Sequence, residues 1–289
     1  PVMSVTFSPA TSEAEKILQS EVGLQKTPMV QYRYFNPDEI LYTNNKGYAD
    51  LSNRMKADDN TSFNAYSLTK TFTAVAILQL AQRGLLDLDQ PVNLYLPHAE
   101  VWPTVTIRHL LSHTSGIGNP MPLKWIHLVE EHISFDREKF NAQVLLKKVL
   151  QKAMPGKKMA YSNLGYILAG LVIEAVSGLS YEQYITENII HQQPGENRQL
   201  GFTIPHPLLH ATGYHNRYSL SGMFLGLLLD KKKYTGQPVG KWLPFKPNYV
   251  NGVAYGGLIG TANAFVAFGQ ALLKENEQLL SSRYKEIMF

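Results

Sequence analysis

The run YSLTKTFTAVAILQLA, residues 66–81, contains the features that decide the fold. From Thr69 onward it predicts a helix that ends just before Gly84, since glycine commonly terminates helices. Almost every residue from Phe72 to Ala81 is apolar, so the helix has almost no polar face. Because a helix that is apolar all round is buried, we expect the other elements to pack around it.

The chain before this central helix predicts a helix and an antiparallel hairpin. Residues 12–26 place apolar side chains on one helical face. Two strand-like segments follow at 29–35 and 39–43, and the Asn-Pro-Asp turn at 36–38 joins them. The polar run at 44–47 is typical of a loop and ends the second predicted strand.

The chain after the central helix predicts mostly helices. They are expected at residues 106–112, at 163–176, from Ser180 onward and at 262–274. Residues 195–255 are rich in Gly, Pro, Tyr and Asn and predict loops with short helices, one of them near 219–230. A hairpin followed by a long helical middle indicates the α+β class, with an antiparallel sheet flanked by helices and a mostly helical lobe.

The composition is that of an ordinary globular protein. Its 289 residues are 44% hydrophobic and 17% charged, with a net charge of +4. The lysines form no stripe interleaved with aromatic residues, so we expect no nucleic-acid partner. No apolar run approaches the ~20 residues that cross a bilayer. Without cysteine the chain has no thiol nucleophile and no disulfide. A periplasmic or secreted location is favoured, with any leader outside the given chain; the oligomeric state is left open.

Ser67 and Lys70 form the strongest local signal for chemistry. They are three residues apart at the start of the central helix, so their side chains share a face. The helix N-terminus favours negative charge developing at Ser67, and apolar surroundings disfavour the ammonium form of Lys70. Taken alone, the same pattern also fits a serine that caps a helix beside a lysine that reaches solvent.

Tyr161 and Asn163 form the second signal, 94 residues after Ser67 (161 minus 67) and just before another apolar helix. Side chains two apart share a face of an extended segment. A phenolate near an ammonium group can accept a hydroxyl proton and later return it. Taken alone, this pair also fits a tyrosine in the core and an asparagine at a helix N-cap.

With their flanks, these segments resemble the serine β-lactamase and penicillin-binding protein superfamily. They most resemble the branch that contains class C β-lactamases, D-Ala-D-Ala carboxypeptidases, D-aminopeptidases and family VIII carboxylesterases. The matching stretches are FNAYSLTKTFTA (63–74), GLLDLDQPV (84–92) with YLP (95–97), VTIRHLLSHTSG (105–116), and PG (155–156) with YSNLGY (161–166) and SG (177–178). Their order and separations match the family over roughly residues 30–275.

The resemblance implies a β-lactamase/transpeptidase-like fold and a role for each residue of the two signals. Ser67 is acylated with the assistance of Lys70, and its backbone N–H forms half of an oxyanion hole. Tyr161 acts as general base and then acid, and Asn163 orients the substrate and the lysine. The substrate is a small molecule or peptide: a D-amino-acid peptide, an ester or a β-lactam.

Neither a metal nor a cofactor is expected. His109 and His113 have the i, i+4 spacing of zinc ligands, but no His-Glu-x-x-His motif is present. The resemblance gives the stretch around His113 a structural role, in which it closes a helix and braces the site. No Gly-x-Ser-x-Gly motif occurs, so an α/β-hydrolase is excluded.

The family's third motif, Lys-Thr-Gly or His-x-Gly on a strand that lines the site, does not follow Gly256-Gly257 in this chain. The sequence 233–236, Lys-Tyr-Thr-Gly, precedes that point and is no substitute. We therefore expect a single catalytic domain, 1–289, that lacks its C-terminal strands. Its lobes are expected at 1–85 with 250–289 (α/β) and at 86–249 (helical).

The leading hypothesis is a serine hydrolase that cleaves amide or ester bonds through an acyl-enzyme on Ser67. A peptidase, such as a carboxypeptidase, or an esterase is favoured over a dedicated β-lactamase, because nothing in the sequence dictates a lactam substrate. The alternative is a non-catalytic, penicillin-binding-like binding or scaffold protein that retains the fold.

Overall fold

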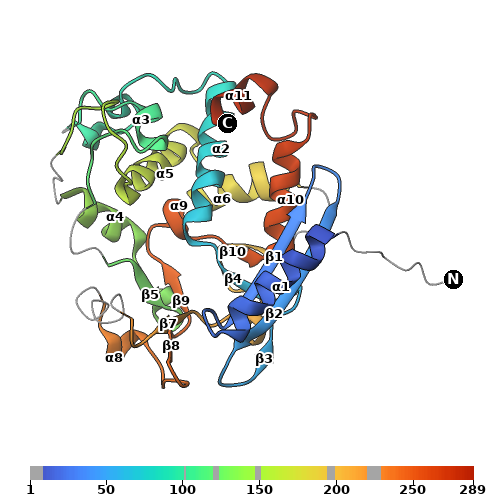
Figure 1. Cartoon of the computed structure of the whole chain (residues 1–289). Helices are drawn as coiled ribbons and strands as arrows, with labels where there is room; N and C mark the ends of the chain where they lie inside the picture. The colour runs from blue at the N-terminus through green and yellow to red at the C-terminus, as the bar shows by residue number, and fades with distance from the viewer. Residues whose placement is uncertain (1–8, 101, 120–123, 147–150, 194–198, 220–228) are drawn as a thin grey trace. The chain divides into compact units, whose positions relative to one another are not determined.

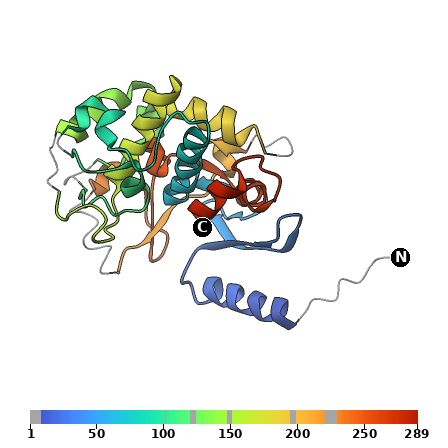
Figure 2. The same ribbon diagram turned by 90° about the horizontal axis from the view of Figure 1, so that it is seen from above.

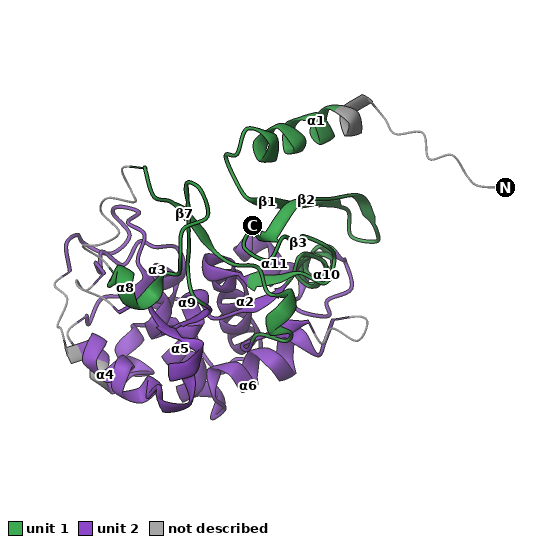
Figure 3. Ribbon diagram, turned by 90° about the horizontal axis from the view of Figure 1, so that it is seen from below, with its two compact units in different colours: residues 1–63, 204–246, 261–273 green, residues 64–203, 247–260, 274–289 purple. Residues whose placement is uncertain are grey.

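The computed structural model describes residues 9–100, 102–119, 124–146, 151–193, 199–219 and 229–289. Contacts between residues divide the chain into two compact units, which Figure 3 colours separately. Unit 1 comprises residues 1–63, 204–246 and 261–273, and unit 2 comprises residues 64–203, 247–260 and 274–289. The mixture of antiparallel strands and helices is the α+β class that the sequence predicts.

Unit 1 is built on an antiparallel sheet of three strands in the order β1-β2-β3. Helix α1 packs on β2 and helix α10 packs on β1, and Figure 2 shows α1 beside the hairpin. The described elements of unit 1 are α1 (Pro9–Gly23), β1 (Met29–Phe35), β2 (Ile40–Asp50), β3 (Met55–Lys56), η6 (Pro207–Leu209), β7 (Tyr214–Asn216), α8 (Lys231–Tyr234), β8 (Trp242–Pro244) and α10 (Ala262–Leu273). The expected hairpin and the expected helix at 262–274 are therefore present.

The prediction that strand β2 ends at residues 44–47 was wrong, because β2 continues to Asp50. Gly47 pairs with Met29 and has a φ of +85°. A Cβ at this position would lie 2.2 Å from the carbonyl oxygen of Pro28. The glycine is thus required by the close approach of a neighbouring backbone within the sheet, and it does not mark a loop.

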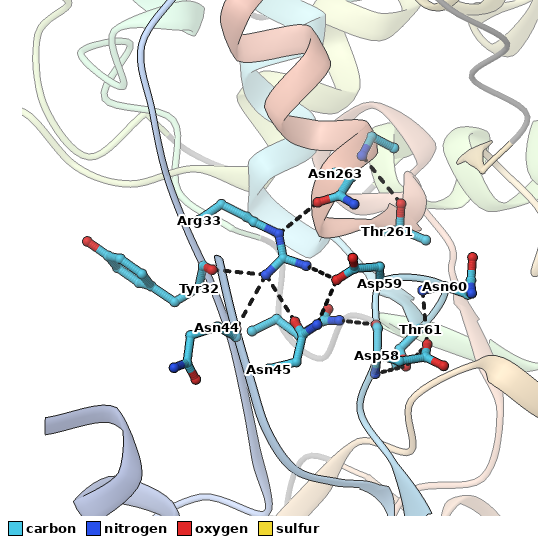
Figure 4. A network of polar contacts seen from close by, with 12 residues as sticks. Tyr32, Arg33, Asn44, Asn45, Asp58, Asp59, Asn60, Thr61, Thr261 and Asn263 are labelled. Carbon is cyan, nitrogen blue, oxygen red and sulfur yellow. Dashed lines mark hydrogen bonds and ion pairs between the residues drawn. The ribbon is translucent and has the colours of Figure 1, made fainter. Parts of the chain in front are cut away.

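A network of polar contacts around Arg33 joins the parts of unit 1 (Figure 4). The Arg33 side chain is only 3% exposed and forms an ion pair with Asp59 at 2.7 Å. It also donates to the side-chain oxygens of Asn45 at 3.0 Å and of Asn263, on α10, at 2.7 Å. One buried cation therefore links both strands of the hairpin, the turn that follows β3 and a helix from the C-terminal part of the chain.

Unit 2 is mostly helical, and its centre is helix α2 (Thr69–Gln82). The remaining elements are η1 (Tyr66–Leu68), α3 (Ile107–Leu111), β5 (Ile126–Leu128), α4 (Arg137–Leu146), α5 (Asn163–Ser177), α6 (Tyr181–Ile185), β6 (Leu200–Gly201), β9 (Asn248–Val250), α9 (Val253–Gly256) and α11 (Ser282–Met288). Short 3-10 helices at Val92–Leu94, Pro97–Ala99 and Val129–Ser134 and a π-helical turn, η5 (Thr186–Ile190), complete it. Strands β4 (Ser62–Asn64) and β10 (Ile259–Thr261) lie where the chain passes between the units.

The core of unit 2 forms where α2, α5 and α9 meet, and Figure 1 shows α2 and α5 side by side. Phe72, Ile77 and Leu80 of α2 are fully buried, as its all-round apolar pattern predicted. Burying each such side chain contributes about 1.5–3 kcal/mol. On α5, a Cβ at Gly170 would lie 2.5 Å from the Cβ of Ala254, so only glycine permits this contact with α9.

The helix ends in unit 2 follow the predicted signals. Thr106 caps α3 and Ser180 caps α6 through bonds from backbone N–H groups. Gly84 and Gly178 follow α2 and α5 with φ values of +71° and +73°, the left-handed conformation that ends helices.

The prediction of residues 195–255 was wrong in one respect, because this region also contains the short strands β6, β7, β8 and β9. Each has two or three residues, which is too few to show an alternating pattern. The helix predicted near 219–230 falls largely on residues 220–228, outside the described residues.

Among the described residues, no helix alone is long and apolar enough to cross a membrane. Helix α5 and the following Tyr181–Ile190 segment reach that length and composition only together, with a bend of 79° between them.

Candidate active site

Ser67 lies in the short helix η1, whose end runs directly into α2. The preceding residue, Tyr66, has a φ of +44°, a conformation that few residues other than glycine adopt. The segment is held from both ends: Ala65 N–H donates to the Leu258 carbonyl at 2.8 Å, and Leu258 N–H donates to the Thr69 hydroxyl at 3.1 Å. Ser67 is therefore fixed at a helix start, where unpaired N–H groups can stabilise negative charge.

Lys70 is one turn further along and is buried, with 6% of its surface exposed. Its Nζ donates to Ser67 Oγ at 3.1 Å and to the backbone carbonyl of Tyr255 at 2.8 Å. In the described part of the chain, no carboxylate forms an ion pair with this amine. Burial without a counter-charge lowers the pKa of Lys70 to about 8. The neutral amine is thus accessible near physiological pH.

Three tyrosine rings surround the Lys70 amine. Its Nζ lies 4.9 Å from the ring centre of Tyr161, 5.5 Å from that of Tyr166 and 5.3 Å from that of Tyr255. Contacts within about 6 Å of a ring centre attract a cation. Burial raises the pKa of Tyr166 to about 12, and it also raises the pKa of Tyr255. Both phenols are therefore neutral at physiological pH.

Tyr161 brings the third reacting group to Ser67. Its phenol oxygen lies 2.6 Å from Ser67 Oγ, and either oxygen could donate the hydrogen bond. The Tyr161 side chain is 48% exposed, so a molecule from solvent can reach the pair. The structure therefore brings together the hydroxyl, the amine and the phenol that sequence reasoning selected from two distant segments.

Asn163 is the first residue of α5 and lies two residues after Tyr161. Its backbone N–H donates to the Asn119 side-chain oxygen at 2.7 Å. Its own Oδ1 is buried and has no hydrogen-bond partner among the described residues. The structure therefore does not join Asn163 to Lys70 by a hydrogen bond, and it leaves an acceptor free beside Tyr161. The N-cap of α5 is Ser162, which accepts from Gly165 N–H at 3.1 Å.

Sequence reasoning missed Tyr255 and Asn119. Tyr255 binds Lys70 through a backbone carbonyl, which every residue type has, so its identity carried no signal. The neighbouring Gly256 did carry one: its Cβ position lies 3.1 Å from Val250 and 3.6 Å from the Tyr66 backbone. A small residue suits this tight packing, which places the segment beside η1.

The two histidines that have zinc-like spacing in sequence are engaged elsewhere. His109 Nδ1 accepts from Thr106 N–H at 3.2 Å and completes the capping box of α3. His113 Nδ1 accepts from Ser162 N–H, also at 3.2 Å. Within the described residues, no three His, Asp or Glu side chains are grouped as a metal ion would require.

Comparison with known proteins gives the relatives of this chain. A family model described as Beta-lactamase matches residues 15–288. Penicillin-binding protein 4* of Bacillus subtilis is 34% identical over 152 residues, which cover 52% of this chain and 33% of that protein. The match thus spans about a third of the length of this curated relative.

Solved structures with the same fold cover nearly the whole chain. The octameric penicillin-binding protein homologue from Pyrococcus abyssi has a TM-score of 0.71 and 25% identity, over 95% of this chain and 59% of that one. The D-amino acid amidase from Ochrobactrum anthropi SV3, solved with D-phenylalanine, has a TM-score of 0.74 and 21% identity, over 96% of this chain and 74% of that one.

Proposed function

The chain belongs to the Beta-lactamase family, within the serine β-lactamase and penicillin-binding protein superfamily, and on that premise we propose that it hydrolyses amide or ester bonds through an acyl-enzyme on Ser67. One observation carries this proposal. Ser67 Oγ lies 2.6 Å from the Tyr161 phenol and 3.1 Å from the Lys70 amine, so two groups can take its proton.

The proton passes through these groups as the acyl-enzyme forms. As Ser67 Oγ attacks the substrate carbonyl, Tyr161 accepts the serine proton, and the oxyanion binds the backbone N–H of Ser67. Tyr161 then gives the proton to the leaving nitrogen or oxygen, and the acyl group stays on Ser67. In the second half, Tyr161 takes a proton from water as the hydroxide attacks the acyl carbonyl. The bond to Ser67 Oγ then breaks, Tyr161 gives this proton to Ser67 Oγ, and the acid is released.

The low pKa of Lys70 determines when the Tyr161–Lys70 pair can accept the serine proton. In the fully protonated pair, Tyr161 is a phenol and Lys70 is an ammonium. The competent form has lost one of these two protons, and the remaining proton can lie on either group. Because burial lowers the pKa of Lys70 to about 8, this form becomes populated as the pH rises through that value. The acylation rate should therefore increase with an apparent pKa near 8.

The proposed substrates are amides or esters with a D-amino acid or a small acyl group. The amidase with the same fold, solved with D-phenylalanine, supports an amide of this kind. A peptidase or esterase is favoured over a dedicated β-lactamase, since the three reacting groups demand only an accessible carbonyl.

A non-catalytic binding protein that retains the fold is the second candidate. It is favoured by the free Oδ1 of Asn163, because the family's machinery uses this asparagine to orient the lysine and no such bond is present. A protein of this kind would form at most a slow adduct on Ser67 and release no product.

Mass spectrometry after exposure to a fluorophosphonate or a penicillin distinguishes the candidates, together with turnover of p-nitrophenyl esters. The hydrolase predicts an adduct on Ser67 and turnover, both lost in Ser67→Ala and both kept in Ser112→Ala, whose serine is exposed on the loop after α3. A stable adduct without turnover indicates the binding protein. No adduct and no turnover would eliminate the acyl-enzyme.

A further inference from the structure

His113 contacts the chain on both sides of Tyr161. Its backbone carbonyl accepts from Ala160 N–H at 2.8 Å, and its ring Nδ1 accepts from Ser162 N–H at 3.2 Å. The residues immediately before and after the phenol are thus tied to one residue of a segment 48 positions earlier (161 minus 113).

The imidazole ring also lies against the phenol itself. The ring centres of His113 and Tyr161 are 4.4 Å apart, and those of His113 and Tyr166 are 5.1 Å apart. Tyr166 is anchored in turn, because its hydroxyl donates to the Leu111 carbonyl at 3.0 Å. His113 therefore contacts both the backbone around Tyr161 and its ring.

The backbone of His113 is held in an unfavourable conformation. Its φ of +58° lies in the left-handed region, which few residues other than glycine, asparagine, aspartate and histidine adopt. Such a conformation persists only where the surroundings over-determine it, and it is common at functional sites.

The bond from Ser162 defines the state of the ring. Nδ1 can accept from the backbone only if it carries no proton, so the neutral ring has its proton on Nε2. A proton on Nδ1 would turn the acceptor into a donor that faces another donor. The hydrogen bond would then break.

We propose that neutral His113 is a positioning residue for Tyr161, which it holds in contact with Ser67, and that protonation of Nδ1 releases this segment and inactivates the site. The proposal rests on the proposed function for its kinetic effect, but the state of the ring can be tested without turnover. His113 does not itself abstract the serine proton, since its Nδ1 accepts from Ser162 N–H and its Nε2 carries the ring proton.

The charges around His113 favour the neutral ring. The titratable groups that face it are Lys70 from α2, Tyr161 from the segment before α5, and Tyr166 from α5. Burial lowers the pKa of His113 below its ordinary value of 6.5, and the nearby Lys70 charge lowers it further. The site therefore stays assembled at neutral pH and opens only in acid.

Two substitutions separate the two contacts of the ring. His113→Asn keeps an acceptor at the position of Nδ1 and tolerates a positive φ, whereas His113→Phe keeps an aromatic ring and removes the acceptor. We expect His113→Asn to stay within about 3-fold of the wild-type acylation rate at pH 7. Below pH 6 it should keep the pH dependence set by Lys70 and Tyr161 and lose only the additional inactivation that protonation of His113 causes in the wild type. We expect His113→Phe to lose about 10-fold or more in kcat with little change in KM.

His109→Asn is the matched control. His109 also accepts a backbone N–H on Nδ1 at 3.2 Å, but this bond closes α3 and lies away from Tyr161. It should keep the wild-type rate and the additional loss of rate below pH 6. A wild-type rate in His113→Phe, or the same additional loss below pH 6 in His113→Asn as in the wild type, would overturn the proposal.

Nuclear magnetic resonance of 15N-labelled histidine in the Ser67→Ala protein tests the ring state independently of turnover. We expect His113 to show an unprotonated Nδ1 and a protonated Nε2 at pH 7, and to titrate below 6.5. The opposite tautomer would refute the proposal. If the tautomer is as expected and the wild-type protein turns nothing over, the function has failed while the contact geometry stands.

Discussion

Two buried cations, Arg33 in unit 1 and Lys70 in unit 2, have opposite surroundings. Arg33 of unit 1 makes five hydrogen bonds, one of them an ion pair with Asp59 (Figure 4). Lys70 of unit 2 has a serine hydroxyl, a backbone carbonyl and three aromatic rings around it. Among the residues that the structure describes, no carboxylate forms an ion pair with Lys70.

The difference distinguishes a structural cation from a reactive one. A guanidinium stays charged and its planar donors can all be satisfied, so burial of Arg33 joins strands and helix. An amine that is buried without a counter-charge moves its pKa toward neutrality, which suits proton transfer and costs stability. Perturbed groups of the second kind cluster at functional sites.

The largest expected effect is the loss of acylation when the reactive cluster is dismantled. Lys70→Ala and Tyr161→Phe should each lower the acylation rate by about 10²-fold or more, because each removes a group that handles the serine proton. Reaction with a p-nitrophenyl ester or a fluorophosphonate measures it. Tyr218→Phe, at a tyrosine 70% exposed in unit 1, is the control and should leave the rate unchanged. Near-normal rates in both site variants would remove the mechanism.

The next effect is on stability and concerns Arg33. Arg33→Met should lower the free energy of unfolding by about 2–3 kcal/mol, since it leaves the oxygens of Asn45 and Asn263 unpaired. Asp59 is 56% exposed, so water can solvate its carboxylate once Arg33 is removed. This solvation limits the loss in the free energy of unfolding. Denaturant unfolding measures it, and Arg33→Lys, which retains the charge but fewer donors, should fall between. An unchanged midpoint in the Met variant would mean that the network is not structural.

Lys70→Met should change stability with the opposite sign. The folded-state pKa of about 8 lies below the ordinary lysine value of 10.5, so burial penalises the protonated amine at every pH below 8. Between these values the unfolded chain binds the extra proton, and wild-type stability rises with pH. Removal of this penalty is worth up to about 3 kcal/mol, and the Tyr255 carbonyl left without its donor offsets about 1–2 kcal/mol of it. The variant should therefore be more stable by about 1–2 kcal/mol at pH 7, and this gain should disappear as the pH approaches 10.5. A gain that grew with pH would contradict the assignment.

The smallest effect is expected at a surface ion pair. Arg108 contacts both carboxylate oxygens of Asp89, at 2.7 and 2.9 Å, but these side chains are 45% and 66% exposed. Arg108→Gln should cost no more than about 0.5 kcal/mol, and less in high salt. Unfolding at two salt concentrations checks this. A loss as large as that of Arg33→Met would show that burial does not distinguish the two pairs.

Much of unit 2 was predictable because its signals are local. An apolar run between Thr69 and Gly84 can only be a buried helix, and the capping residues of α3 and α6 fixed where those helices begin. Short strands such as β7 and β9 were not predictable, because three residues show no period and their partners lie far along the chain. Gly47 was misread for the same reason: the backbone it accommodates belongs to another strand.

The candidate site also combines residues that the sequence predicted with residues that only the structure revealed. Ser67 and Lys70 were selected by spacing within one helix, and Tyr161 and Asn163 by resemblance to a family. The carbonyl of Tyr255, which receives Lys70, and the ring of His113, which holds Tyr161, came only from the coordinates. Sequence spacing also did not predict that Asn163 Oδ1 would be left without a partner.

The sequence by itself determined a central apolar helix with a hydroxyl and an amine one turn apart at its start, because helical geometry depends only on near neighbours. The tertiary structure decided what surrounds that amine: a phenol from 91 residues later (161 minus 70) and a carbonyl from 185 residues later. Such contacts depend on how whole elements pack. The apolar helix predicted the direction of the Lys70 pKa shift, but the partners of the amine are set by the assembled core.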